Sequence, residues 1–138
     1  MAAFATGTAA AATPGAEAAR VSEMFANYRE ALLDRDFATA CTLTAPETDR
    51  ALIANLKKLK ITVATCEAGF RWIYSPTRQG GAAAKLADEI TRTTRVSKIT
   101  VTGQSATIVW SAKLDGRRVT VSHTARRIGG QWQLVDVD

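Results

Sequence analysis

Apolar residues recur every three or four positions through the first half of the chain, which is the spacing of amphipathic helices. Between Glu17 and Arg35 the intervening positions are mostly charged or polar, so this segment predicts a helix with one buried face. The apolar residues of that face are Val21, Met24, Phe25, Tyr28 and Leu32. Three shorter helices are predicted after it, over residues 37–43, 46–60 and 66–74.

The segment TAPETDR contains residues that are typical of the start of a helix. Thr44 is expected to cap this helix, and Pro46 suits its first turn because proline has no N–H to leave unpaired. The segment SPTRQGG, residues 75–81, is rich in turn formers and predicts a loop.

Apolar and polar residues alternate in the second half of the chain, which is the spacing of strands. The predicted strands are Val96–Thr102, Ala106–Leu114, Arg118–Ile128 and Gln131–Val137. The pair Asp115-Gly116 between two alternating runs is typical of a tight hairpin. Helices followed by an antiparallel meander predict an α+β fold, in which the helices pack on one face of a curved sheet of about four strands.

The first sixteen residues differ in composition from the rest of the chain. They are rich in Ala, Thr and Gly and carry no charge, and such a segment buries too little apolar surface to offset its ordering entropy. We expect residues 1–16 to be a disordered tail or spacer and residues 17–138 to form a single domain. The segment lacks the basic start and compact apolar core of a signal peptide. It is either the spacer that remains once an export signal or anchor is removed, or a plain extension.

The chain is basic, with a formal net charge of +5 and a pI of about 9.6. This balance favours acidic partners. The basic residues are spread along the chain, however, without the long block or the interleaved aromatic residues of a nucleic-acid platform, so no specific nucleic acid is expected. No apolar run approaches the roughly 20 residues that a membrane-spanning helix needs.

Alternation along the predicted strands assigns side chains to an inward, apolar face. That inward set is Ile108, Trp110 and Ala112, then Val119, Val121, His123 and Ala125, then Trp132, Leu134 and Asp136. The only histidine of the chain therefore falls on the apolar side, and Asp136 falls with it.

The order of these elements resembles the nuclear transport factor 2-like superfamily, which includes ketosteroid isomerase and the SnoaL-like cyclases. The matching features are the long first helix with Phe25 and Tyr28, the DRDF step at Asp34 to Phe37, the short helices, and the closing hairpins that end in GGQWQL. The resemblance covers the chain from about Ala18 onward and implies a cone-shaped, cystatin-like α+β fold. Within the superfamily the chain is similar to small exported proteins of high-GC Gram-positive bacteria, which carry one cysteine after the first helix and another about two dozen residues later.

The chain has two cysteines, Cys41 and Cys66. A nucleophilic cysteine needs a base, and His123 is the only candidate. A zinc site needs about four ligands, so no metal is expected. Two unpaired, buried thiols remain an alternative, but the resemblance favours a Cys41–Cys66 disulfide. A persistent disulfide would place the protein in an oxidising, extracytoplasmic compartment, whereas free thiols would suit the cytoplasm.

Enzymes of the superfamily work inside the cone, where acid/base residues project from the strands into an apolar cavity that raises the pKa of a carboxyl group. The resemblance implies His123 and Asp136 as catalytic candidates, and Tyr28, Trp110, Val121 and Trp132 as pocket residues. Each also has a structural interpretation: a hydrogen-bonded core histidine, a solvated aspartate near the sheet edge, and core aromatic residues. The SnoaL-like pattern places an aromatic residue before the aspartate, and here Val135 stands there.

We predict from these features a non-enzymatic exported domain that binds a protein partner or an apolar small molecule in or near the cone pocket, without a cofactor. The alternative is a cofactor-independent cyclase or isomerase that uses Asp136 or His123 as general base on a polycyclic or lactone-like substrate. A third possibility is an anion-binding outer sheet face built on Arg118 and Arg126. A monomer is expected, with a sheet-mediated homodimer as the alternative.

Overall fold

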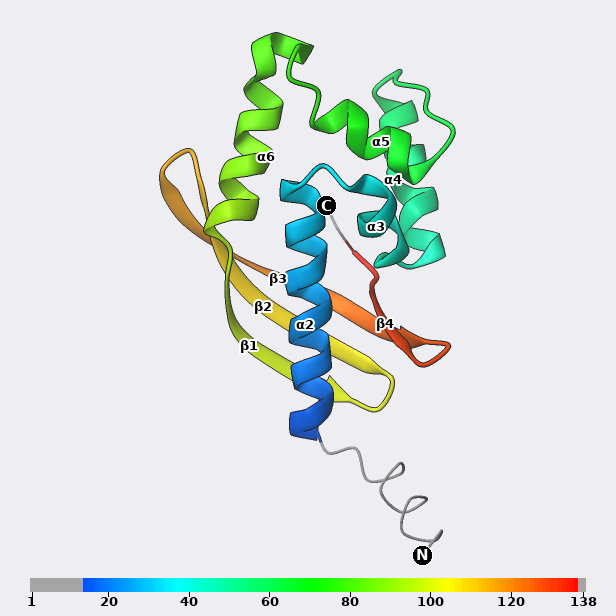
Figure 1. Cartoon of the computed structure of the whole chain (residues 1–138), viewed down its shortest axis with the longest axis vertical. Coiled ribbons are helices and arrows are strands. Elements are labelled where there is room, and N and C mark those ends of the chain that lie inside the picture. The colour runs from blue at the N-terminus through cyan, green and yellow to red at the C-terminus, as the bar shows by residue number, and fades with distance from the viewer. Residues whose placement is uncertain (1–13, 137–138) are drawn as a thin grey trace, which may run out of the picture.

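The computed structural model describes residues 14–136 of the chain. These residues form five α-helices and one four-stranded antiparallel sheet that does not close on itself (Figure 1), which confirms the α+β class. The helices are α2 (Pro14–Leu33), α3 (Phe37–Thr42), α4 (Pro46–Lys58), α5 (Cys66–Ile73) and α6 (Ala82–Thr93), with a short 3-10 helix, η1 (Arg78–Gly81), before α6. The strands are β1 (Arg95–Thr102), β2 (Ser105–Leu114), β3 (Arg117–Ile128) and β4 (Gln131–Leu134), and they neighbour one another in chain order.

The helices lie on one face of the sheet. Figure 1 shows α2 lying across the strands, with α6 to one side of it and α3, α4 and α5 gathered near its C-terminal end. On the covered face Ile108, Ala112 and Ala125 are fully buried, whereas Thr107 and Ser122 on the other face are exposed. The predicted inward and outward alternation of β2 and β3 is confirmed.

The β2–β3 hairpin turns at the predicted Asp-Gly pair. Asp115 and Gly116 both have positive φ, 55° and 80°, as a two-residue turn of this hand requires. The Glu89 carboxylate of α6 accepts hydrogen bonds from both of their backbone N–H groups, at 2.7 and 3.3 Å. The tip of this hairpin is therefore tied to α6.

Several ends differ from the sequence prediction. The first helix begins at Pro14, so residues 14–16 of the predicted tail are helical, while residues 1–13 lie outside the described residues. The prediction that Thr44 caps α4 is wrong: Ala45 occupies the cap position without a side-chain bond, and the Thr44 hydroxyl bonds to the Asp49 carboxylate and the Cys41 carbonyl. The last strand ends at Leu134.

Helix α6 was not predicted. Its buried positions, such as Ala84 and Thr91, are small or polar, and its last turn reads TRTT, which resembles a strand by propensity. In the structure Thr91, Thr93 and Thr94 each donate a hydroxyl hydrogen bond to the carbonyl four residues earlier. Such bonding lets threonine fit the end of a helix. A prediction based on the spacing of large apolar residues does not detect a helix of this composition.

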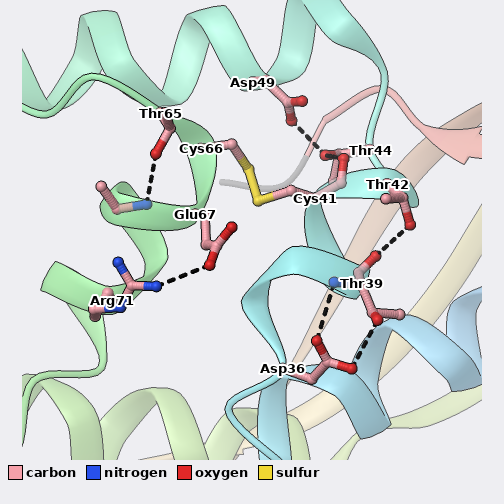
Figure 2. The surroundings of a disulfide bond; sticks show 11 residues. Asp36, Thr39, Cys41, Thr42, Thr44, Asp49, Thr65, Cys66, Glu67 and Arg71 are labelled. Carbon is pink, nitrogen blue, oxygen red and sulfur yellow. Dashed lines mark hydrogen bonds and ion pairs between the residues drawn. A yellow bond between two sulfur atoms is a disulfide. The ribbon is translucent and has the colours of Figure 1, made fainter.

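The two cysteines form a disulfide that joins α3 to α5 (Figure 2). This confirms the pairing and leaves neither sulfur free as a nucleophile or metal ligand. Both helices are short, with six and eight residues. Helices of that length are not stable in water without tertiary contacts. Side-chain caps add to the support, because Asp36 accepts from the Thr39 N–H and Thr65 accepts from the Ala68 N–H.

Removing the disulfide is expected to destabilise the domain without changing its fold. The double variant Cys41→Ser, Cys66→Ser should lose about 3 kcal/mol of unfolding free energy, because the bond closes a loop of 25 residues in the unfolded chain. Urea unfolding followed by circular dichroism measures this loss. Reductant should destabilise the wild type equally and leave the double variant unaffected; a wild type indifferent to reductant would contradict the prediction.

Candidate ligand cavity

A cavity of about 330 Å³ lies between α2, α5, α6 and the covered face of β2 and β3. Most of its wall is aliphatic or aromatic. The polar members of the wall are Tyr28, Arg29, Tyr74, Thr91, Thr94 and His123. None of the wall residues within the described part of the chain is an aspartate or glutamate, so the only formal charge on the wall, with the histidine neutral, is that of Arg29.

His123 is held in the wall by Trp110. The indole Nε1–H of Trp110 donates to Nδ1 of His123 at 3.1 Å, and the two ring centres are 5.2 Å apart. An indole N–H can only donate, so Nδ1 must carry a lone pair, and the proton of the neutral imidazole sits on Nε2. This hydrogen bond thus determines which ring nitrogen of His123 is a hydrogen-bond donor.

The Nε2–H group of His123 has no hydrogen-bond partner among residues 14–136. The histidine is only 8% exposed. A buried donor left unpaired costs about 1–3 kcal/mol. His123 therefore carries an unused donor within the wall of a largely apolar cavity, and an apolar cavity with a few polar groups is the arrangement expected of a small-molecule site.

The two tyrosines of the wall remain protonated at neutral pH. Burial raises the pKa of Tyr28 and that of Tyr74. The Tyr74 hydroxyl lies 3.3 Å from the Thr91 hydroxyl, and the Arg35 guanidinium packs 4.6 Å above the Tyr74 ring. Arg35 also pairs with Asp88 of α6 through two bonds of 2.9 Å, so this side of the cavity is fixed by contacts between α2, α5 and α6.

Arg29 reaches across from α2 to the end of α6. Its Nε and Nη2 groups donate to the Thr91 carbonyl at 3.4 and 3.2 Å. Burial lowers the pKa of the guanidinium, although arginine keeps its charge in proteins. No carboxylate of the described residues lies within ion-pair distance of it.

The structure brings together four of the six residues predicted for the site. Tyr28, Trp110, Val121 and His123 line the cavity. Trp132 is buried but is not in the wall, and its Nε1 has no hydrogen-bond partner among the described residues.

Asp136 is not in the wall of the cavity. It follows the end of β4, and its carboxylate accepts from the Thr124 backbone N–H at 2.6 Å. The alternation that placed Asp136 inward does not extend past Leu134, because the regular strand ends there. His123 and Asp136 thus take different partners, Trp110 and Thr124.

Sequence reasoning missed the contribution of α6. Ala87, Ile90, Thr91 and the cap residue Thr94 line the cavity from this side. Their numbers are three, one and three apart, which is the spacing of one helix face, but apart from Ile90 they are alanine or threonine, which carry little hydrophobic signal. Arg29 is one of the charged positions between the apolar residues of the first helix, and such positions are expected to face solvent, so it was missed.

The described residues contain no group of three or more His, Cys, Asp or Glu side chains that could hold a metal ion. None of the helices among residues 14–136 is long and apolar enough to cross a membrane.

Comparison with known proteins gave no match: no protein-family model, curated protein or solved structure is significantly similar to this chain. The geometry of the cavity is therefore the basis for assigning a function.

The histidine geometry makes a prediction for NMR. The chain has one histidine, so a long-range ¹H–¹⁵N spectrum reports His123 alone. For the neutral ring in the ligand-free protein we expect the pattern of protonation on Nε2, because Trp110 donates to Nδ1. In Trp110→Phe, which lacks that donor, a mixture of the two neutral forms should appear. A wild-type ring protonated on Nδ1 would contradict this geometry.

Proposed function

We propose that this chain is a small binding domain that holds an apolar small molecule in the cavity between α2, α6 and the sheet. The observation that carries the proposal is the unpaired, buried Nε2–H of His123 in a mostly apolar wall. A ligand with one hydrogen-bond acceptor would pair with that donor. Its apolar remainder would be removed from water at a gain of roughly 25 cal/mol per Å².

Binding is favoured over acid/base catalysis by the protonation pattern of His123. A general base needs a free lone pair directed at the substrate. The lone pair at Nδ1 is taken by Trp110, and the nitrogen left over carries a proton. The other catalytic candidate, Asp136, bonds to Thr124 and does not line the cavity. This arrangement supports recognition of an acceptor in preference to the cyclase or isomerase alternative.

The proposal extends to family and compartment. We propose membership of the nuclear transport factor 2-like superfamily with its cone-shaped fold. The proposal is supported by a long first helix and several short helices that lie on one side of a closing antiparallel meander. An oxidising, extracytoplasmic compartment is supported by the Cys41–Cys66 disulfide. A protein partner at the mouth of the cavity is the second kind of ligand compatible with this proposal.

A pair of matched ligands tests the role of the cavity. We expect 2-propionylnaphthalene, a neutral ketone, to bind about fivefold more tightly than 2-propylnaphthalene, because a net hydrogen bond is worth about 1 kcal/mol. Chemical-shift titration by NMR measures both affinities. In His123→Phe the preference for the ketone should disappear.

A cavity-filling variant supplies the control. Ala87→Phe places a ring in the cavity wall and should weaken both ligands at least tenfold. Ala26→Phe puts the same ring on the exposed side of α2 and should leave both affinities unchanged. If neither ligand binds the wild type, or if both still bind Ala87→Phe as before, the cavity is not the binding site.

A further inference from the structure

This inference rests on the proposed function: the charge of the cavity wall indicates which class of small molecule the cavity binds. Arg29 supplies the only formal charge of the wall, and no carboxylate of the described residues neutralises it. Arg35, which lies six residues further along the chain and just after α2, does pair with a carboxylate, that of Asp88. The other arginine of α2, Arg20, also has a carboxylate partner, Glu17, so Arg29 is the arginine of this helix without one.

The bond from Arg29 to the Thr91 carbonyl accounts for only part of its capacity. A guanidinium has five N–H donors in a planar fork, and two of its nitrogens are directed at this one oxygen. That carbonyl belongs to the last turn of α6, where carbonyls lack helical partners and carry partial negative charge. The carbonyl thus orients the side chain, but as a partial charge it does not neutralise a full one.

We propose that the ligand is an apolar molecule with a single anionic head group, such as a carboxylate, and that Arg29 binds this head group. Hydrogen bonds between a guanidinium and a carboxylate are charge-assisted and often bidentate. The aliphatic and aromatic wall takes the apolar body of the ligand. His123 Nε2–H is then available either to a second oxygen of the head group or to a polar atom along the body.

The other titratable groups of the wall agree with a negative ligand. Tyr28 and Tyr74 remain neutral because burial raises the pKa of each phenol, so neither repels an anion. His123 presents a donor and no lone pair. A cationic ligand, in contrast, would lie beside Arg29 with no carboxylate of the described wall to stabilise it.

Three ligands with the same ten-carbon chain separate head-group charge from apolar burial. We expect decanoate to bind the full-length protein at least tenfold more tightly than 1-decanol, and decylammonium to bind more weakly than either. Titration followed by NMR, below the concentration at which the ligands aggregate, gives the three dissociation constants. The flexible chain lets the head group reach Arg29 whatever its depth in the cavity.

Substitution at Arg29 tests the assignment. In Arg29→Gln the advantage of decanoate over 1-decanol should fall to about twofold or less, while the affinity for 1-decanol stays the same and reports that the variant is folded. Arg92→Gln removes the same charge from an exposed position of α6 outside the cavity wall and should keep the decanoate preference. Arg29→Lys, which keeps the charge and loses the fork, should be intermediate.

The outcomes distinguish the ligand class from the proposed function. If 1-decanol binds and decanoate binds no more tightly, the anionic class is wrong and the cavity function stands. If Arg92→Gln lowers the preference as much as Arg29→Gln, the effect comes from net charge, and Arg29 is not the head-group site. If none of the three ligands binds, both the ligand class and the cavity function fail.

Discussion

The packing of α2 and α6 against the same face of the sheet is the constraint on which the rest of the structure depends. The sheet has one apolar face, which must be covered, and α2 covers part of it with large side chains such as Phe25 and Leu32. The side of α6 that faces the cavity includes small or polar residues such as Ala87 and Thr91. Because these side chains fill less volume than aromatic ones, the space between α6 and the sheet is not closed, and a cavity results.

The polar groups of the cavity are positioned by the same packing. Trp110 and Val121 face each other in the β2–β3 register, and so do Ile108 and His123, which sets Trp110 and His123 on a diagonal of the covered face. Diagonal neighbours on one face are within reach of aromatic side chains, and here the contact becomes a hydrogen bond. Arg29 is oriented by the free carbonyl at the end of α6. The β2–β3 register thus positions His123, and the end of α6 orients Arg29.

The elements that could be predicted from the sequence are those marked by regularly spaced large apolar residues or by turn-forming residues. The long helix with Phe25 and Tyr28, the Asp115-Gly116 hairpin and the inward placement of His123 were predicted from spacing alone, and the α+β class followed. Helix α6 was not, because Ala and Thr carry little hydrophobic signal and its start at Gly81 lacks a side-chain cap. The inward placement of Asp136 assumed that alternation continues, and a strand end cannot be read from alternation.

The hydrogen-bond partners of His123 and Arg29 could not be predicted from the sequence, because they depend on how separate elements pack together. The bond between Trp110 and His123 depends on the β2–β3 register, and the isolation of Arg29 depends on which carboxylates α6 carries toward α2. Asp88 faces Arg35, and Glu89 faces the hairpin tip, so neither reaches Arg29. The spacing of charges along a helix does not reveal such choices, because they are made between elements.

A domain with a hollow between its helices and its sheet loses the dispersion contacts that a filled core would supply. Contacts outside the cavity hold the elements of its wall in place. The disulfide fixes α3 to α5, the Arg35–Asp88 pair fixes α2 to α6, and at the start of α2 the buried Glu17 carboxylate contacts Arg127 of β3 at 3.2 Å. These contacts connect α2, α5, α6 and β3 of the cavity wall to neighbouring elements, and none of the six residues that make them lines the cavity. The elements of the wall are thereby held in place while the space between them remains unfilled.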